Sequence, residues 1–426
     1  MRRLRWLALV ATCAVAVTTL LATAGSAQVA SPAARTAPVT IEFWNYWDGN
    51  NAKAIEALIE RFNRAHPAIR VKNVTFPWGN LFEKMQAAAA GGDLPDVAAG
   101  DIAWMANLHR SGKLADLSKA ARKGVNLKDF YPELLRYSTY RGKLQSLPVS
   151  TNNLGLFYNR DIFRRAGLDP NRPPKSWVEL RQAAIKIAGL GGGIQGFEIF
   201  TQPGEGLTWQ FQPYIWQAGG EYLKPPSYTE PGFNNRAGRR ALNFLAGLIL
   251  SDKVAQVGQW GAFDKGQAGM RVDGSWMVSI YKDQAPFDFG TATIPVCNGC
   301  SRATNMGGEQ IFVFKGDTQK VAAATTFALW LTSTKVQVEW DMRTSFMPVR
   351  ASVAKDKGFL RWVAAEPRFK PFVEQQKAAR ARPPIPQYSA TSDAFSKEIE
   401  KAFYGKVSVA EALRNADAAV RLALRS

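Results

Sequence analysis

A strand near the start of the chain ends in a cluster of flat, polar-tipped side chains. Residues 39–48 read VTIEFWNYWD, and the first half of this segment alternates apolar and polar residues as a half-buried strand does. The cluster that follows consists of Trp44, Asn45, Tyr46, Trp47 and Asp48. Aromatic faces cover the C–H side of a sugar ring, while an amide and a carboxylate bond its hydroxyls. The cluster therefore predicts a site for a flat polar ligand such as a sugar.

Similar polar-aromatic clusters recur after expected strands or in loops. They are Asp101 with Trp104, the run 150–153 (STNN), the segment 208–220 (TWQFQPYIWQAGG), the segment 263–276 (FDKGQAGMRVDGSW) and 306–310 (MGGEQ). Trp209 and Trp216 lie seven residues apart and share one helical face, and core packing is the simpler interpretation of any single aromatic there. Glycines 274, 307 and 308 favour binding instead, because they let backbone amides approach a ligand closely.

The chain offers little for catalysis. Its two histidines, His66 and His109, have no Ser, Cys or acidic partner at a recognisable spacing, and no G-x-S-x-G, H-E-x-x-H or P-loop motif occurs. A pair of carboxylates that hydrolyses a glycoside stays open as an alternative, because the fold brings such pairs together. We therefore expect a binding protein without metal or cofactor, and not an enzyme.

Residues 1–27 have the pattern of a signal peptide. Three arginines among the first five residues precede an apolar run over 7–21, and small residues follow, so cleavage is expected after Ala24 or Ala27. Cys13 lies inside the apolar run, so we interpret it as part of the leader, and a lipoprotein is the less favoured alternative. Residues 28–38 are expected to form a flexible arm. No later apolar run reaches the roughly 18–20 residues that span a bilayer.

Length and charge narrow the class of protein further. About 390 residues remain after cleavage, which suits two lobes of about 150–200 residues each. The net charge is +19, or +16 without the leader arginines, and the basic residues are scattered apart from AARARPP at 378–384. No basic stripe interleaved with aromatics occurs, so we expect no nucleic-acid partner.

Cys297 and Cys300 form an isolated close pair, in the sequence PVCNGCS. In an exported protein such a pair is typical of a small disulfide across a turn. A redox-active C-x-x-C is the alternative. The intervening Asn-Gly favours a tight turn, and the segment that follows is poor helix material, so we predict the structural disulfide.

Helix and strand signals alternate along the chain, which predicts an α/β fold with a mostly parallel sheet. After the first strand we expect a helix ending at His66-Pro67, a strand at 69–76, a helix near 80–90 and a short buried strand ending at Asp101. A new strand with a helix behind it follows near 153. Capping boxes predict helix starts at Ser176 and Ser408. Further helices are expected at 208–218, 236–251, 265–270 and 318–334, and further strands at 194–200, 269–273, 288–294 and 310–314.

The order of these motifs resembles the maltose-binding-like bacterial extracellular solute-binding proteins of family 1, which serve ABC importers, usually for carbohydrates. The resemblance covers nearly the whole mature chain. Its most specific segment is LPVSTNNLGLFYNRDIFRRAGLDPNRPPKSWVEL. The strand ending in WNYWD, the segments AIEALIERFNRAHP, LPDVAAGDIAWMANLHRSGKLADLS and FDKGQAGMRVDGSW, the Gly-Gly before a strand and FMPVR at 346–350 complete it.

The family implies a two-lobed periplasmic-binding-protein fold of type II, with a ligand cleft between lobes that close over the ligand. Mapped onto this chain, one lobe would hold residues 39–148 and 301–346, and the other 149–300 and 347–426. A small carbohydrate ligand, permease subunits of the importer and a monomeric state are implied as well. Gram-positive members usually carry a lipid-anchoring cysteine after the leader, so its absence here favours a free periplasmic protein.

The resemblance also implies site residues. The end of the first strand supplies Trp44, Tyr46 and Trp47 for stacking, with Asn45 and Asp48 as polar partners. Positions that match ligand contacts of the family are Asp101, Asn152, Asn153, Trp216, Trp260, Asp273, Gly274, Trp276, Gly308 and Glu309. Arg343 and Arg350 flank the last crossing between lobes, either as ligand contacts or as salt bridges between the lobes. An anionic polyol phosphate bound by the same fold, and a secreted carbohydrate-active enzyme, are the alternatives to a neutral sugar.

Overall fold

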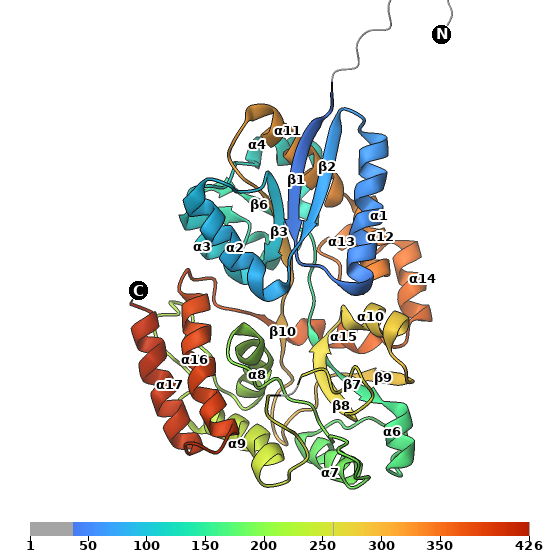
Figure 1. Ribbon diagram of the computed structural model, residues 1–426, viewed down its shortest axis with the longest axis vertical. Coiled ribbons are helices and arrows are strands. Elements are labelled where there is room, and N and C mark those ends of the chain that lie inside the picture. Colours follow the sequence, from blue (N-terminus) through green and yellow to red (C-terminus); the bar gives the residue numbers. More distant parts are fainter. Residues whose placement is uncertain (1–36, 259, 426) are drawn as a thin grey trace, which may run out of the picture. The chain divides into compact units, whose positions relative to one another are not determined.

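The computed structural model describes residues 37–258 and 260–425, so the predicted signal peptide and most of the expected arm lie outside the described residues. From Pro38 to the end the chain clusters as one compact unit. Two sheets organise this unit, and each is covered by helices (Figure 1). Among the described residues no helix is both long and apolar enough to cross a membrane.

The larger sheet has five strands in the order β2-β1-β3-β11-β6. These strands are β1 (Val39–Asn45), β2 (Ile69–Thr75), β3 (Val97–Asp101), β6 (Ser146–Pro148) and β11 (Glu309–Val313). β1 pairs in parallel with β2 and β3, whereas β11 runs antiparallel to β3 and to β6. The expected mostly parallel sheet is therefore parallel on one side and antiparallel on the other.

Helices cover both faces of this sheet (Figure 1). They are α1 (Gly49–Ala65), α2 (Trp78–Gly91), α3 (Met105–Arg110), α4 (Ser118–Gly124), α5 (Pro132–Leu135), α11 (Thr318–Leu331) and α12 (Thr334–Thr344). α1 buries Ile55, Leu58, Ile59 and Phe62 at the spacing of one helical face. It ends at Ala65, because the proline at position 67 cannot continue the helical hydrogen bonds. α11 packs against β1 and β11.

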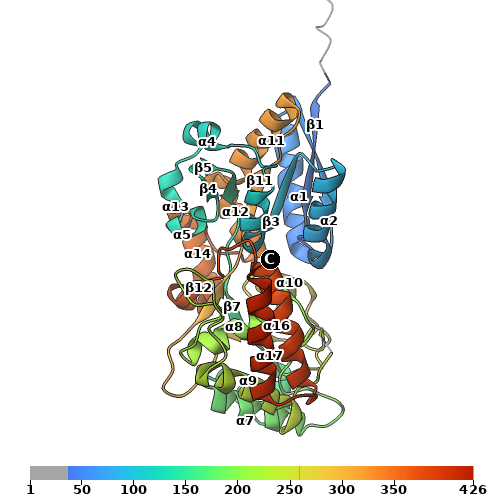
Figure 2. The ribbon, with the colours of Figure 1, turned by 90° about the vertical axis from the view of Figure 1, so that its left-hand side faces the viewer.

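The smaller sheet has the order β8-β7-β9 and is antiparallel throughout. Its strands are β7 (Leu154–Asn159), β8 (Met270–Gly274) and β9 (Phe289–Ala292). The surrounding helices are α6 (Arg160–Arg165), α7 (Trp177–Ala188), α8 (Glu205–Gln217), α9 (Arg236–Leu250), α10 (Met277–Gln284), α15 (Lys370–Gln375), α16 (Tyr388–Phe403) and α17 (Val409–Ala423). α16 and α17 pack side by side, at the front of Figure 2.

Short elements complete the chain. Two-stranded sheets pair β4 (Thr139–Tyr140) with β5 (Lys143–Leu144), and β10 (Thr304–Met306) with β12 (Ala379–Ala381). The remaining helices are α13 (Ala351–Ala354) and α14 (Lys357–Ala365), with short 3₁₀ turns η1 (Ile102–Trp104), η2 (Leu127–Asp129) and η3 (Gln376–Ala378). The chain passes from the larger to the smaller sheet after β6 and returns towards the larger sheet after β9.

Both predicted helix starts are confirmed. The Ser408 hydroxyl accepts a hydrogen bond from the amide of Glu411 (3.2 Å) at the start of α17. The Ser176 hydroxyl accepts from the amide of Glu179 (3.1 Å) at the start of α7. The carboxylate of Glu179, however, accepts from the amide of Lys175 (2.6 Å). In a regular capping box it would accept from the amide of the N-cap residue itself, Ser176.

Two predicted elements were wrong. The expected helix at 265–270 is a turn followed by β8, because Gly266 has φ +69° and cannot sit in a right-handed helix in that conformation. The expected strand at 194–200 makes only isolated bridges, from Gln195 to Ala268 and from Glu198 to Arg271. Gly196 lies directly against the backbone of Ala184 in α7, so the segment follows this helix and does not join a ladder.

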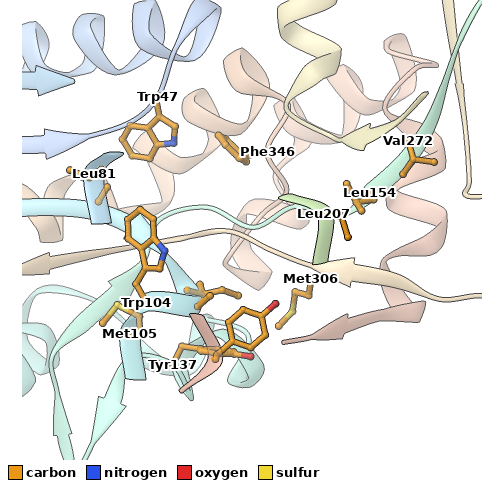
Figure 3. Packing of buried hydrophobic residues seen from close by; sticks show 14 of the residues in the cluster. Trp47, Leu81, Trp104, Met105, Tyr137, Leu154, Leu207, Val272, Met306 and Phe346 are labelled. Carbon is orange, nitrogen blue, oxygen red and sulfur yellow. The ribbon is translucent and has the colours of Figure 1, made fainter. Parts of the chain in front are cut away.

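The predicted disulfide is confirmed. Cys297 and Cys300 are joined across the turn after β9, with their Cα atoms 5.3 Å apart. Most of the buried apolar side chains form one continuous core around the larger sheet and the α7–α9 helices, and a second group surrounds Phe157 of β7. Figure 3 shows part of the main core, including Trp47 and Phe346, which also contribute to the cavity described next.

Candidate functional site

A cavity of about 230 Å³ lies where the ends of β1, β3 and β8 meet the start of α8. Parallel strands such as β1 and β3 end at the same edge of their sheet, which places the residues after them side by side. Its walls are formed by Tyr46, Trp47, Asp48, Asn51, Trp78, Asp101, Asn152, Phe200, Glu205, Gly206, Trp209, Gln210, Trp260, Asp273, Trp276, Gly307, Gly308, Glu309, Phe346 and Arg382. Residues of both sheet regions therefore share one cavity.

Aromatic rings make up a large part of this wall. The rings of Trp209 and Trp276 are stacked, with centroids 5.7 Å apart and an interplanar angle of 21°. The ring of Phe346 lies next to that of Trp276, with centroids 6.2 Å apart. Gly274 makes this arrangement possible, because a Cβ at that position would lie 1.9 Å from the indole of Trp276. The result is a row of flat faces that suits the C–H side of a ring-shaped ligand.

Carboxylates dominate the charged part of the wall. Asp48, Asp101, Glu205, Asp273 and Glu309 all line the cavity. Arg382 is the single cationic side chain among the described lining residues. Burial raises the pKa of Asp48, of Glu205 and of Asp273. The wall is consequently rich in hydrogen-bond acceptors and poor in positive charge.

The guanidinium of Arg382 is already engaged. One terminal nitrogen donates to Glu205 at the start of α8 (2.7 Å), and the other donates to Asp101 at the end of β3. Arg382 is almost completely buried, and its backbone oxygen accepts from the hydroxyl of Tyr137 (2.7 Å). This side chain therefore links the end of the larger sheet to α8, and two carboxylates offset its positive charge.

Glu309 occupies an unusual position in the wall. Its Oε1 accepts a hydrogen bond from the hydroxyl of Tyr46 (2.9 Å), and its Oε2 is buried without a hydrogen-bond partner among the described residues. Burial, with the nearby charge of Asp101, raises the pKa of Glu309 to about 8. Burial likewise raises the pKa of Tyr46 well above its ordinary value. Glu309 is therefore expected to hold a proton more strongly than an exposed glutamate does.

Four other lining residues contain polar atoms that are buried and lack partners in the described part of the chain. They are the indole nitrogens of Trp47 and Trp209, the side-chain oxygen of Asn152 and the Nε of Arg382. Buried polar groups are paired in most proteins, and each exception calls for an explanation. Their concentration around one cavity indicates that a polar ligand completes these hydrogen bonds.

Arg271 of β8 supports the wall from behind. It is buried, and its guanidinium pairs with Asp273 (2.7 Å) and with Glu198 (3.2 Å). The same group lies 4.3 Å from the centroid of the Trp260 ring. Asp273 and Trp260 both line the cavity. One buried cation thus positions a carboxylate and an aromatic face at the site.

Two glycines bring the backbone to the cavity. Gly308 has φ +136°, and a Cβ there would lie 2.3 Å from the backbone oxygen of Ser150. At Gly307 a Cβ would lie 2.3 Å from the side-chain oxygen of Asn152. The backbone before β11 and the segment 150–153 are therefore too close together for any residue larger than glycine at positions 307 and 308.

The structure gathers many of the predicted site residues around the cavity. They are Tyr46, Trp47, Asp48, Asp101, Asn152, Trp260, Asp273, Trp276, Gly308 and Glu309. Trp44, Asn45, Asn153, Trp216, Gly274, Arg343 and Arg350 do not line it.

The predicted residues outside the cavity have other partners. Trp44 packs on Phe76, and Asn45 bonds Asn73 (2.7 Å). The amide of Asn153 donates to Gln376 (2.6 Å), and Trp216 lies under Arg380. Gly274 lies directly against the indole ring of Trp276. Arg343 pairs with Glu339 in its own helix (3.0 Å), which is not the expected bridge between lobes, whereas Arg350 pairs with the distant Asp129 (3.3 Å).

Some lining residues were absent from the prediction. They are Asn51, Trp78, Phe200, Glu205, Gly206, Trp209, Gln210, Gly307, Phe346 and Arg382. Trp209 and Gln210 belong to a cluster that the sequence does mark, and core packing was the simpler interpretation of the indole. Arg382 belongs to the basic run 378–384, where nothing local indicates its partners. Among the described residues no group of three or more His, Cys, Asp or Glu side chains is placed to hold a metal ion.

The model of the bacterial extracellular solute-binding protein family matches residues 47–338. The chain belongs to this family. The match covers more than half of the chain and includes most segments that form the cavity.

Solved structures share the two-lobed type II fold of this family. The cyclic alpha-maltosyl-1,6-maltose binding protein from Arthrobacter globiformis is 40% identical to this solute-binding protein, covers 91% of it and 99% of its own chain, and has a TM-score of 0.77. The GacH receptor of Streptomyces glaucescens, solved unliganded and with acarbose, is 26% identical, with coverage of 91% and 99% and a TM-score of 0.80.

A curated relative comes from Salmonella typhimurium. Its sn-glycerol-3-phosphate-binding periplasmic protein UgpB is 24% identical over 345 residues, which is 76% of this chain and 78% of that protein. These relatives are binding proteins. A further structural relative of 25% identity is an ABC transporter solute-binding protein from Thermotoga lettingae. The present chain is accordingly a substrate-binding protein of the kind that serves ABC importers.

Proposed function

We propose that this protein captures a neutral sugar or oligosaccharide in the cavity and delivers it to the permease subunits of an ABC importer. The observation that carries the proposal is the composition of the wall. It combines stacked indoles, such as Trp209 and Trp276, with several carboxylates and a single arginine that is already paired. Aromatic faces and hydroxyl acceptors are the groups that bind a sugar ring. The 40% identical relative that binds a cyclic maltosyl-maltose supports the same ligand class.

The similarity to UgpB raises the alternative of a polyol phosphate. The charge of the cavity wall argues against it, because an anionic phosphate needs positive charge that is not already neutralised. Arg382 is shared by Asp101 and Glu205, and further carboxylates line the same wall. The net charge of +16 on the mature chain comes from basic residues outside the cavity, because Arg382 is the one basic residue among the described lining residues. A neutral ligand is therefore favoured over an anionic one.

Capture would work through closure of the two lobes. The cavity takes Asp101 from the end of β3 and Glu205 from the start of α8, so a ligand that touches both stabilises the arrangement in which they are close. A ligand shifts such an equilibrium only by its differential affinity for the two states. The expected lobe boundaries, monomeric state, signal peptide and free periplasmic location complete the proposal. The absence of catalytic motifs supports binding without chemistry.

The test is a titration of tryptophan fluorescence in the mature chain. Maltose, maltotriose and a cyclic tetrasaccharide serve as neutral probes, and glycerol 3-phosphate serves as the anionic probe. We expect a saturable change with at least one neutral sugar, and loss of that change in Trp209→Ala. Trp362→Phe is the control, because this indole lies outside the cavity. Saturable binding of glycerol 3-phosphate alone, weakened by salt, would replace the sugar with the anion.

A further inference from the structure

Two carboxyl groups stand at directly opposed positions on neighbouring strands of the larger sheet, in the wall of the cavity. Asp101 and Glu309 are direct partners in the antiparallel pairing of β3 with β11. Side chains of directly opposed residues lie on the same face of a sheet, so two like charges at these positions repel one another. Both residues are at least nine-tenths buried, and both line the cavity. The structure has to accommodate this repulsion.

The two carboxyls receive different hydrogen bonds from their neighbours. Asp101 accepts from the guanidinium of Arg382 and from the amide of Ala103 (2.8 Å). Glu309 accepts only from the hydroxyl of Tyr46, through Oε1. Its Oε2 has no hydrogen-bond partner among the described residues. The other terminal nitrogen of Arg382 donates to Glu205. The guanidinium therefore forms an ion pair with Asp101 and none with Glu309.

We propose that Asp101 and Glu309 hold a single proton between them, carried by Oε2 of Glu309, and that this singly protonated pair is the form that binds the ligand. Ionised Glu309 would place a second, uncompensated negative charge beside Asp101 in the wall. That charge has no partner in the cavity wall, so it opposes the further burial that a bound ligand imposes. The ligand part of this inference depends on the proposed function, whereas the proton can be tested without a ligand.

The pair makes binding depend on pH in a defined direction. The charged and titratable groups that face Glu309 are Tyr46 after β1, Asp101 on β3 and Arg382 after β12, with Glu205 of α8 behind the arginine. Burial and the charge of Asp101 raise the pKa of Glu309 to about 8. If only the protonated form binds, Kd rises tenfold for each pH unit above about 8. At pH 9.5 it is about 30-fold higher than at neutral pH.

The first experiment uses no ligand. Side-chain carboxyl carbons of the mature chain, labelled with ¹³C at Glu and Asp, are followed by NMR between pH 5 and pH 10. We expect one glutamate carboxyl to titrate near pH 8, to disappear in Glu309→Gln, and to move to lower pH in Asp101→Asn. The proposal is wrong if every glutamate carboxyl titrates below about pH 6, or if the signal near pH 8 survives in Glu309→Gln.

The second experiment measures the Kd of maltotriose by calorimetry from pH 6.5 to pH 9.5. We expect the wild type to lose about 30-fold in affinity, and Glu309→Gln, which is neutral at every pH, to keep a flat profile. A flat wild-type profile, or the same loss in both proteins, overturns the role of the pair in binding. If neither protein binds any sugar, the proposed function fails, and the NMR titration still decides where the proton is.

Discussion

Replacing Arg271 with methionine removes the buried cation behind the cavity wall. Arg271 pairs with Asp273 and with Glu198, whose side chains are 8% and 0% exposed. Removing one member of a buried ionic cluster leaves uncompensated charge and costs about 3–5 kcal/mol. The contact of Arg271 with Asp264 adds little to this figure, because that side chain is 42% exposed. We therefore expect Arg271→Met to lower the free energy of unfolding by about 3–5 kcal/mol.

The same change acts on ligand binding. Asp273 and Trp260 line the cavity, and each loses the group that fixes its position. We expect the Kd for a bound sugar to rise about tenfold or more, which corresponds to about 1.4 kcal/mol. This loss should be visible at temperatures where the variant is still folded, as checked by far-UV circular dichroism.

Arg368→Met is the matched control. Arg368 also lies over an aromatic ring, at 4.5 Å from Phe289, and pairs with Asp288 (3.2 Å). This pair is about one-third exposed on both sides and lies outside the cavity, so its removal should cost about 1 kcal/mol or less. Urea unfolding compares the two variants. Equal small losses in both, with unchanged sugar affinity in Arg271→Met, would refute the reasoning.

Three further outcomes are expected. Trp276→Ala should weaken sugar binding about tenfold by calorimetry, because it removes a stacked face, whereas Trp362→Ala should leave the Kd unchanged. Gly308→Ala should lower stability by about 1–3 kcal/mol in thermal unfolding, because φ +136° and the contact with Ser150 leave no room for a Cβ; an unchanged midpoint would contradict this. Burial lowers the pKa of His109 to about 4, so protonation favours the unfolded chain. Stability should therefore fall as the pH drops from about 6.5 towards 4, and His109→Phe should lose less over this range.

The sequence predicts most of the framework because the framework depends on local patterns. Alternation over 39–43 identifies β1, the spacing of Ile55 and Phe62 identifies α1, and Ser408 with Glu411 identifies the start of α17. Each of these signals lies within a few residues. The end of the first strand likewise points to a site, because aromatics mixed with an amide and a carboxylate are rare in a plain strand end.

The details of the cavity could not be predicted, because they depend on contacts between distant segments. Arg382 meets Asp101 across 281 positions, and Tyr46 meets Glu309 across 263. No local pattern indicates such a pairing. Trp44 is the converse case, since it belongs to the aromatic cluster but packs on Phe76 and does not line the cavity. The sequence shows that a strand end is special without showing which of its side chains reach the ligand.

The order in which the wall is encoded has a consequence for biosynthesis. The cavity begins with Tyr46 and is closed only by Arg382, about nine-tenths of the way along the chain. A chain that is exported amino end first, as proposed here, therefore has no complete pocket until nearly all of it has crossed the membrane. Sugar cannot act as a template for the early steps of folding, and it can stabilise only a chain that is already assembled.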